Sequence, residues 1–239
     1  MYIITGMHRS GTSIISQLVF HAGGDLGDFD KLYPGDRWNP DGYFEQVDIL
    51  GVNISIVNGP WGKFSYFFLP GEELIMKRAK KFNNKIKNLS ETHSNKIVKD
   101  PRFCLTFPAW TKYGSKIEKV VVNIREPIQV ANSLKKRNHI PVSLGLNLWY
   151  EHNKRLLDYV NNKEYVLLNY HKLLDPAVNM KEFERVLEFF NIKIAGNKIE
   201  SILREYVRPS MNHNRMVNYK YEGKIEELWN KLLTKYEKQ

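Results

Sequence analysis

Short apolar runs alternate with longer amphipathic segments along most of this chain. Four runs have the β-branched, apolar character of buried parallel strands: Tyr2–Thr5, Lys96–Lys99, Lys119–Ile124 and Tyr165–Asn169. Apolar residues at the spacing of one helix face mark Thr12–Ala22, Glu72–Leu89, Pro127–Arg137, Ser143–Val160, Met180–Phe190, Lys198–Tyr206 and Lys224–Tyr236. This alternation predicts an α/β fold, with helices flanking a parallel sheet on both faces.

The stretch Asp25–Pro70 interrupts this alternation. It is rich in glycine, proline, aspartate and aromatic residues, so we expect an irregular segment. A long loop inside a compact domain is usually functional when it is ordered. Its aromatic residues are candidates for a ligand site and equally for a local core under the loop: Trp38, Tyr43, Trp61, Tyr66, Phe67 and Phe68.

Composition limits the number of domains and the classes of partner that we expect. The 239 residues contain no repeat or linker, which predicts one domain over residues 1–239. The net charge of +10 favours anionic partners, but the lysines are dispersed and no RNA-binding or zinc-finger signature is present, so we do not expect nucleic acid. A single cysteine, Cys104, excludes an internal disulfide, and no Cys/His spacing indicates zinc.

The apolar run at the amino terminus is far too short for a secretory signal, because Tyr2–Thr5 leads directly into a glycine-containing loop. No segment approaches the roughly 18 apolar residues of a membrane span. We therefore expect a cytoplasmic protein without membrane insertion. No feature of the sequence indicates an oligomeric state.

The first predicted strand is followed by the sequence GMHRSGTS at residues 6–13. Glycines allow a tight turn, and the free N–H groups at the start of a helix bind anions. The candidate phosphate ligands are Gly6, Arg9, Ser10, Gly11, Thr12 and Ser13. The spacing nearly matches the nucleotide-triphosphatase loop, yet Thr12 replaces its lysine and the cation is Arg9. This difference argues against hydrolysis of ATP or GTP.

A second anion site is predicted at the end of the strand Lys119–Ile124. Arg125 follows the strand directly, Pro127 begins the next helix, and Ser133 lies eight residues after Arg125. Eight residues are about two helical turns, so both side chains can reach a ligand lying over that helix. A guanidinium group can form two charged hydrogen bonds to one phosphate.

These two motifs resemble the donor-binding sites of the sulfotransferases, in particular bacterial and carbohydrate-type members. The resemblance implies the sulfotransferase type of P-loop-like α/β fold, with 3′-phosphoadenosine 5′-phosphosulfate (PAPS) as sulfuryl donor, 3′-phosphoadenosine 5′-phosphate (PAP) as product, and no metal. It further implies that residues 6–13 bind the 5′-phosphate, while Arg125 and Ser133 bind the 3′-phosphate.

Two further stretches are similar to family motifs. In the sequence KDPR at residues 99–102, the resemblance gives Lys99 a place near the sulfuryl group, beside Arg9. The strand before Tyr170 resembles the family's Y-E-x-L stretch, which implies an adenine-side role for Tyr170. Ser210 lies in a polar segment that could cover the nucleotide.

The sequence NPDGYFE at residues 39–45 resembles a stretch of the bacterial members in which the glutamate faces the acceptor. Glu45 is therefore our candidate general base, with Asp41 and His8 as competitors. We expect the acceptor to be a hydroxyl or amine, favouring a glycan or glycoconjugate. Two alternatives stay open: a small P-loop kinase or other nucleotide phosphotransferase, and a catalytically inactive nucleotide-binding module.

Overall fold

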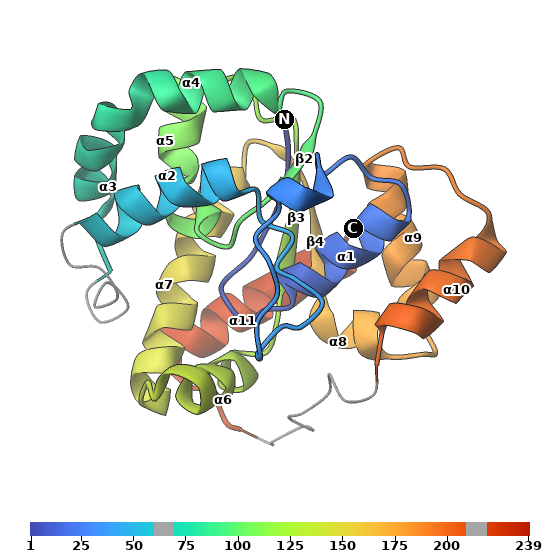
Figure 1. The fold of residues 1–239 in the computed structure, drawn as a ribbon. Coiled ribbons are helices and arrows are strands. Elements are labelled where there is room, and N and C mark those ends of the chain that lie inside the picture. Colours follow the sequence, from blue (N-terminus) through green and yellow to red (C-terminus); the bar gives the residue numbers. More distant parts are fainter. Residues whose placement is uncertain (60–68, 209–218) are drawn as a thin grey trace.

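The computed structural model describes residues 1–59, 69–208 and 219–239. Its centre is a parallel sheet of four strands in the order β2-β1-β3-β4. The strands are β1 (Tyr2–Thr5), β2 (Ile97–Lys99), β3 (Lys119–Ile124) and β4 (Glu164–Asn169). The α/β fold with a parallel sheet is thereby confirmed, and each strand matches its predicted range to within one residue (Figure 1).

Helices cover both faces of this sheet, as predicted. Between β1 and β3 the chain forms α1 (Thr12–His21), η1 (Phe29–Lys31), α2 (Val47–Asn58), α3 (Glu72–Ala79), η3 (Lys80–Phe82), α4 (Asn83–Thr92) and α5 (Phe103–Tyr113). It continues with α6 (Pro127–Asn138), α7 (Val142–Val160), α8 (Tyr170–Leu174), α9 (Asn179–Phe189), α10 (Gly196–Tyr206) and α11 (Gly223–Glu237).

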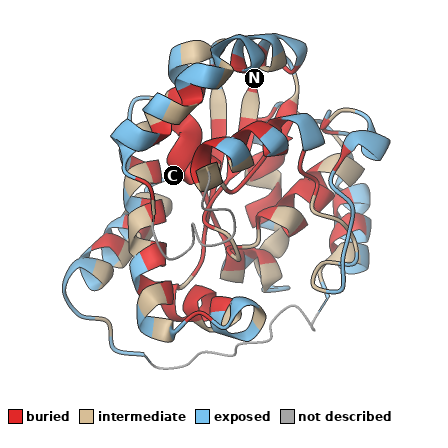
Figure 2. Cartoon of the chain, turned by 60° about the vertical axis from the view of Figure 1, so that its left-hand side comes forward, coloured by how far each residue is buried: buried red, intermediate tan, exposed pale blue. Residues whose placement is uncertain are grey.

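Alternating strand residues build two separate hydrophobic cores. Ile3, Val120 and Val122 face one core, which α2, α3, α4, α5, α7 and α11 complete. Ile4 and Val121 face the other core, which α1, α8, α9 and α10 complete. Figure 2 shows the consequence, with helices that are exposed on their outer sides and buried towards the strands. Burial on both faces explains why the strands read as continuous apolar runs.

The connecting segments differ from the sequence prediction in three places, of which the first two concern α2 and α5. The segment Asp25–Pro70 is not irregular throughout, because Val47–Asn58 forms α2 and buries Ile49 and Ile56. In the sequence, Gly51, Asn53 and Asn58 interrupt the apolar pattern of this helix. The helix α5 was not predicted, since its nearly continuous apolar sequence lacks an amphipathic pattern and contains Pro108.

The single helix predicted over Glu72–Leu89 is interrupted. The 3-10 turn Lys80–Phe82 separates α3 from α4, and α4 continues to Thr92. Leu74, placed on the predicted apolar face, is 41% exposed, while Ile75 is buried. Trp61, Tyr66, Phe67, Phe68 and Ser210 lie outside the described residues.

The strand order places a binding crevice between β1 and β3. From β1 the chain moves outward to β2 and then returns across β1 to β3, so the connections leave β1 and β3 in opposite directions. Ligands of open α/β sheets bind at such a switch point, outside the carboxyl ends of the strands. The loops at this point are residues 6–11 after β1 and Arg125–Glu126 after β3.

Candidate active site

A cavity of about 450 Å³ lies at the carboxyl ends of the strands. Both predicted anion sites line it, together with the segment 37–45. Among the described residues its lining carries two acidic side chains, Asp41 and Glu45, against seven basic ones: Arg9, Arg37, Lys99, Arg125, Lys136, Arg137 and Arg208. With histidine neutral, the formal charge of the lining is therefore +5, which suits a polyanionic ligand.

The loop after β1 is shaped by close contacts. Gly6 has φ 151°, and a β-carbon there would lie 2.4 Å from the main-chain oxygen of Asn123 on β3. Gly11 caps α1 with φ 93°, and its β-carbon would lie 2.1 Å from the ring of Tyr170. Only glycine accommodates both the backbone and the contact. The loop therefore presents the free N–H groups of α1 to the cavity, with no acidic residue in the first turn.

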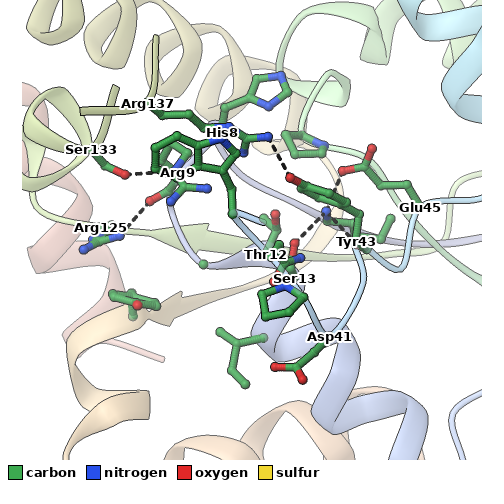
Figure 3. A pocket seen from close by; sticks show the side chains of 18 of the residues that line it. His8, Arg9, Thr12, Ser13, Asp41, Tyr43, Glu45, Arg125, Ser133 and Arg137 are labelled. Carbon is green, nitrogen blue, oxygen red and sulfur yellow. Dashed lines mark hydrogen bonds and ion pairs between the residues drawn. The ribbon is translucent and has the colours of Figure 1, made fainter. Parts of the chain in front are cut away.

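The two predicted anion sites contact each other. Arg9 Nε donates to Ser133 Oγ at 2.8 Å, and Arg125 Nη1 donates to the main-chain oxygen of Arg9 at 2.9 Å (Figure 3). The guanidinium of Arg125 lies 4.3 Å from the centroid of the Tyr170 ring. Tyr170, which lines the cavity, thus packs between Gly11 and Arg125 and joins both sites.

Positive charge is concentrated in this half of the cavity. Burial lowers the pKa of Arg9, and the neighbouring guanidinium groups of Arg137 and Arg125 lower it further. Burial likewise lowers the pKa of Arg125. These pKa shifts reflect desolvated like charges, which an anionic ligand would relieve.

Lys99 is the centre of a second hydrogen-bond network. Its side chain is 1% exposed, and Nζ donates to Glu45 Oε1 at 2.6 Å, the main-chain oxygen of Tyr43 at 2.9 Å and Ser13 Oγ at 3.2 Å. These three bonds use every proton of the ammonium group. Lys99 therefore connects the phosphate loop to the segment that carries Glu45.

The other residues of the KDPR sequence are held in place by hydrogen bonds. Asp100 is fully buried, and its carboxylate accepts from Asn53 Nδ2 at 2.9 Å and Arg102 Nη1 at 3.0 Å. Arg102 Nη1 also lies 3.6 Å from Glu45 Oε2. Glu45 is thus paired with two cations, Lys99 and Arg102, and is 5% exposed.

The two competitors of Glu45 differ in their surroundings. Burial, together with the positive charge of Arg102, His152, Lys99 and Arg137, lowers the pKa of His8 well below its usual value. Its imidazole is therefore neutral at pH 7 and able to accept a proton. Asp41 instead pairs with Arg208 at 3.2 Å, and its side chain is 27% exposed.

Most of the predicted site residues meet at this cavity. Those that line it are His8, Arg9, Gly11, Thr12, Ser13, Asp41, Glu45, Lys99, Arg125, Ser133 and Tyr170. Gly6 and Ser10 belong to the same loop but do not line the cavity: Gly6 packs on β3, and the Ser10 side chain is 2% exposed. The prediction for Ser210 lies outside the described residues.

Sequence reasoning missed four cavity residues as site candidates: Arg37, Lys136, Arg137 and Arg208. A signal was present for two of them. Lys136 and Arg137 lie three and four residues after Ser133, and this spacing puts all three side chains on one side of α6. Arg37 lies in the segment expected to be irregular, and no pattern marks it. Arg208 lies in the polar segment 207–215 that was expected to cover the nucleotide, but Ser210 was the residue singled out there.

Within residues 1–59, 69–208 and 219–239, no helix is long and apolar enough to cross a membrane. The same residues contain no group of three or more His, Cys, Asp or Glu side chains placed to hold a metal ion.

A family model described as the sulfotransferase domain matches residues 1–235. Among solved structures, the chain is similar to the sulfotransferase domain of the Synechococcus PCC 7002 olefin synthase, with 13% identity, a TM-score of 0.59, and coverage of 97% of this chain and 93% of that one. It is also similar to a sulfotransferase domain of the curacin biosynthetic pathway, with 10% identity, a TM-score of 0.57, and coverage of 98% and 97%.

A third similar structure is the sulfotransferase STF1 of Mycobacterium tuberculosis H37Rv, with 13% identity, a TM-score of 0.50, and coverage of 98% of this chain and 76% of that one. At these identities the structural matches show the fold alone. No curated protein matches the sequence significantly.

Proposed function

Because the chain belongs to the sulfotransferase family, we propose that it transfers a sulfuryl group from PAPS to an acceptor hydroxyl or amine. The observation that carries this proposal is the meeting of two anion sites at one cavity, joined by the Arg9–Ser133 and Arg125–Arg9 hydrogen bonds. PAPS has phosphate groups at both ends of its ribose. One such donor can bridge the two sites.

The residues fit this donor in charge and shape. We assign the 5′-phosphosulfate to the N–H groups at the start of α1 with Arg9, Thr12 and Ser13. We assign the 3′-phosphate to Arg125 and Ser133. The volume of about 450 Å³ lies within the range of roughly 300–1,000 Å³ that is common for small-ligand sites. The adenine-side role of Tyr170 stays a proposal, and its contact with Arg125 adds a positioning role.

The transfer step is an in-line displacement at sulfur. The acceptor oxygen forms a bond to sulfur, the bond between sulfur and the bridging phosphate oxygen breaks, and the departing PAP keeps the electron pair. Negative charge grows on that phosphate, and we propose that Arg9 and Lys99 stabilise it. To do so, Lys99 exchanges one of its three present acceptors for the phosphate oxygen. Prepositioned donors of this kind contribute about 3–4 kcal/mol each.

The acceptor also loses a proton. We propose Glu45 as the general base, because its ion pair holds the carboxylate 2.6 Å from Lys99, the cation that we assign to the transfer point. His8 is the second candidate because it lines the cavity from the phosphate loop, but burial and the neighbouring cations that lower its pKa make its imidazole a weaker base. Asp41 is the weakest of the three, since its side chain is 27% exposed and pairs with Arg208 rather than with the proposed transfer-site cation Lys99.

The kinase alternative receives less support from the site. Thr12 takes the place of the phosphate-loop lysine. The acid that follows β2, Asp100, is fully buried and already bonded to Asn53 and Arg102. Asp100 therefore has the surroundings of a structural residue rather than of a magnesium ligand.

For the acceptor we propose a glycan or glycoconjugate. Trp38 and Tyr43 line the cavity beside Glu45, and aromatic rings of this kind pack against the apolar face of a sugar.

Incubation with PAPS and an acceptor panel in the presence of EDTA tests the proposal. Release of PAP, together with a sulfated product, is the expected result. Phosphate transfer from ATP that strictly requires magnesium would replace the proposal with the kinase alternative. Tight binding of PAP without turnover on any acceptor would indicate the inactive nucleotide-binding module.

A further inference from the structure

The cavity contains more cations than the donor has been assigned. Arg9, Lys99 and Arg125 serve the donor in the proposed function, and four further basic side chains line the same cavity: Arg37, Lys136, Arg137 and Arg208. Since arginine and lysine are costly to gather without counter-charges, their presence at a binding cavity indicates additional negative charge in the ligands.

Only part of this additional charge is neutralised within the protein. Arg208 pairs with Asp41 at 3.2 Å, and Arg137 pairs with Asp36 at 3.3 Å. Arg37 instead lies 5.2 Å from the ring centroid of Trp38, and in the described part of the chain no carboxylate oxygen lies within 4.0 Å of it. The same holds for Lys136, which is exposed at the rim. Among the described residues, Arg37 and Lys136 therefore have no carboxylate within ion-pair distance.

Arg137 lies beside the segment that carries Glu45, the proposed general base. Arg137 Nη2 donates to Tyr43 Oη at 2.7 Å, and its Cζ atom lies 5.6 Å from the Tyr43 ring centroid. Lys99 Nζ lies 6.0 Å from the same centroid. The Tyr43 ring is therefore a common neighbour of Arg137 and Lys99, and Figure 3 shows its hydrogen bond to Arg137. A small acceptor can reach both.

Arg137 also adds positive charge close to Arg9 and His8. Its guanidinium group is among the causes that lower the pKa of Arg9 and of His8. The ring of Trp38 lies against both Arg37 and Arg137, at 5.2 Å and 5.9 Å from its centroid. Arg37 and Arg137 thus both lie against the Trp38 ring, and both line the cavity.

We propose that the acceptor itself is anionic, and that its carboxylate, sulfate or phosphate group binds between Arg37 and Arg137 beside Trp38. This inference rests on the proposed function and specifies the substrate class for the same site. The acceptor hydroxyl would lie towards Glu45 and Lys99, and the acidic group about one ring width away, on the side of α6. The competing explanation is that Arg37 and Arg137 serve the donor nucleotide.

Titration of inorganic sulfate into protein saturated with PAP separates these explanations, because the nucleotide then already occupies the donor sites. The variants are Arg37→Gln and Arg137→Gln. The matched control is Lys135→Gln, which removes one exposed positive charge from the same helix outside the cavity. Arg137→Lys keeps the charge. Thermal unfolding of each variant establishes that it is folded.

We expect the PAP complex to bind sulfate. Arg37→Gln and Arg137→Gln should weaken that binding by about tenfold, the usual effect of losing one charged hydrogen bond. Lys135→Gln should leave it unchanged, and Arg137→Lys should retain most of it. PAP affinity should stay within about twofold of wild type in all four variants. The same titration with acetate and with inorganic phosphate distinguishes carboxylate, sulfate and phosphate groups on the acceptor.

Three results would overturn the inference. The PAP complex could bind no sulfate, so that no anion site would exist beside the donor. If it binds sulfate, equal binding in all variants would mark an adventitious ion only. Arg37→Gln or Arg137→Gln could instead weaken PAP as strongly as Arg125→Ala, which would assign these cations to the donor. A wild-type protein that fails to bind PAP at all would reject the proposed function itself, so the two failures are distinguishable.

Discussion

The two halves of the cavity are built in different ways. The half proposed to bind the donor (the donor half), residues 6–13 with Arg125, Ser133 and Tyr170, comes from the loops after β1 and β3, the start of α1, the middle of α6 and the start of α8, and its residues are buried or half-buried. The acceptor half, residues 36–45 with Arg137 and Arg208, comes mainly from a segment whose regular pairing is limited to the isolated bridges Leu32–Gln46 and Asp36–Asn39.

The two halves of the cavity also differ in the contacts that hold their residues in place. The part-buried Arg9–Ser133 and Arg125–Arg9 hydrogen bonds join the proposed donor half. In the proposed acceptor half, Glu45 is held by its buried ion pair with Lys99, whereas the ion pairs Arg137–Asp36 and Arg208–Asp41 are partly exposed. Exposed pairs contribute about 0–1 kcal/mol each. These two exposed contacts of the proposed acceptor half can therefore change at little cost to stability.

The largest expected effect separates chemistry from donor binding. Glu45→Gln should lower turnover by about 10²–10⁴-fold, because the amide cannot take the acceptor proton. PAP affinity should be unchanged. His8→Gln and Asp41→Asn, measured by the same PAP-release assay, are the matched comparisons. A wild-type rate in Glu45→Gln with a loss of that size in His8→Gln would move the base to the phosphate loop.

Lys99→Met should lower turnover by about 10²–10³-fold, since it removes a prepositioned cation from the transfer point. The variant also leaves Glu45 without its 2.6 Å partner. Lys96→Met, just before β2 and outside the cavity, should retain wild-type turnover. Equal rates for the two variants would remove Lys99 from the mechanism.

Gly11→Ala should weaken PAP by at least about tenfold, because the added methyl group would overlap the Tyr170 ring at a φ that alanine rarely adopts. Gly51→Ala is the matched control: a β-carbon on Gly51 meets nothing within 4 Å, and alanine favours its helix α2. Calorimetric titration of PAP measures both. Unchanged affinity in Gly11→Ala would show that Tyr170 and the loop can move apart without loss.

The donor half is recognisable in the sequence because its residues are local. A glycine-containing loop between a strand and a helix, and an arginine followed by a serine two turns later, each lie within about ten residues. The acceptor half depends on contacts across the chain, such as Arg208 with Asp41, whose partners lie 167 residues apart. Residues that meet only after folding leave no spacing to detect.

The same contrast applies to the fold. Four strands were predicted nearly to the residue because each is buried on both faces and bounded by turns. The helix α5 was missed because its apolar residues contact neighbours on several sides. The roles of Arg137 and Trp38 depend on rings and charges from different elements, so periodicity could not reveal them.

The smallest expected effect concerns acid stability behind the donor half. Burial lowers the pKa of His152 and of His171 to about 4, and Arg125 adds to the shift of His171. The unfolded state then binds more protons, so the free energy of unfolding should be highest above about pH 6.5 and fall towards pH 4, by up to about 1.4 kcal/mol per pH unit for each histidine.

Denaturant unfolding between pH 7 and 4 measures this slope. His152→Gln and His171→Gln should each reduce it, while the exposed His139→Asn should not. A slope that is the same in all three variants would assign the acid sensitivity to other groups.

The most direct test of the account compares two nucleotides that differ only in the 3′-phosphate. Wild-type protein should bind PAP at least about tenfold more tightly than AMP. Arg125→Ala should remove this preference by weakening PAP alone, because Arg125 and Ser133 are assigned to the 3′-phosphate. Equal affinity of the wild-type protein for both nucleotides, or an equal loss for both in Arg125→Ala, would contradict the claim that two anion sites hold opposite ends of one doubly phosphorylated adenosine.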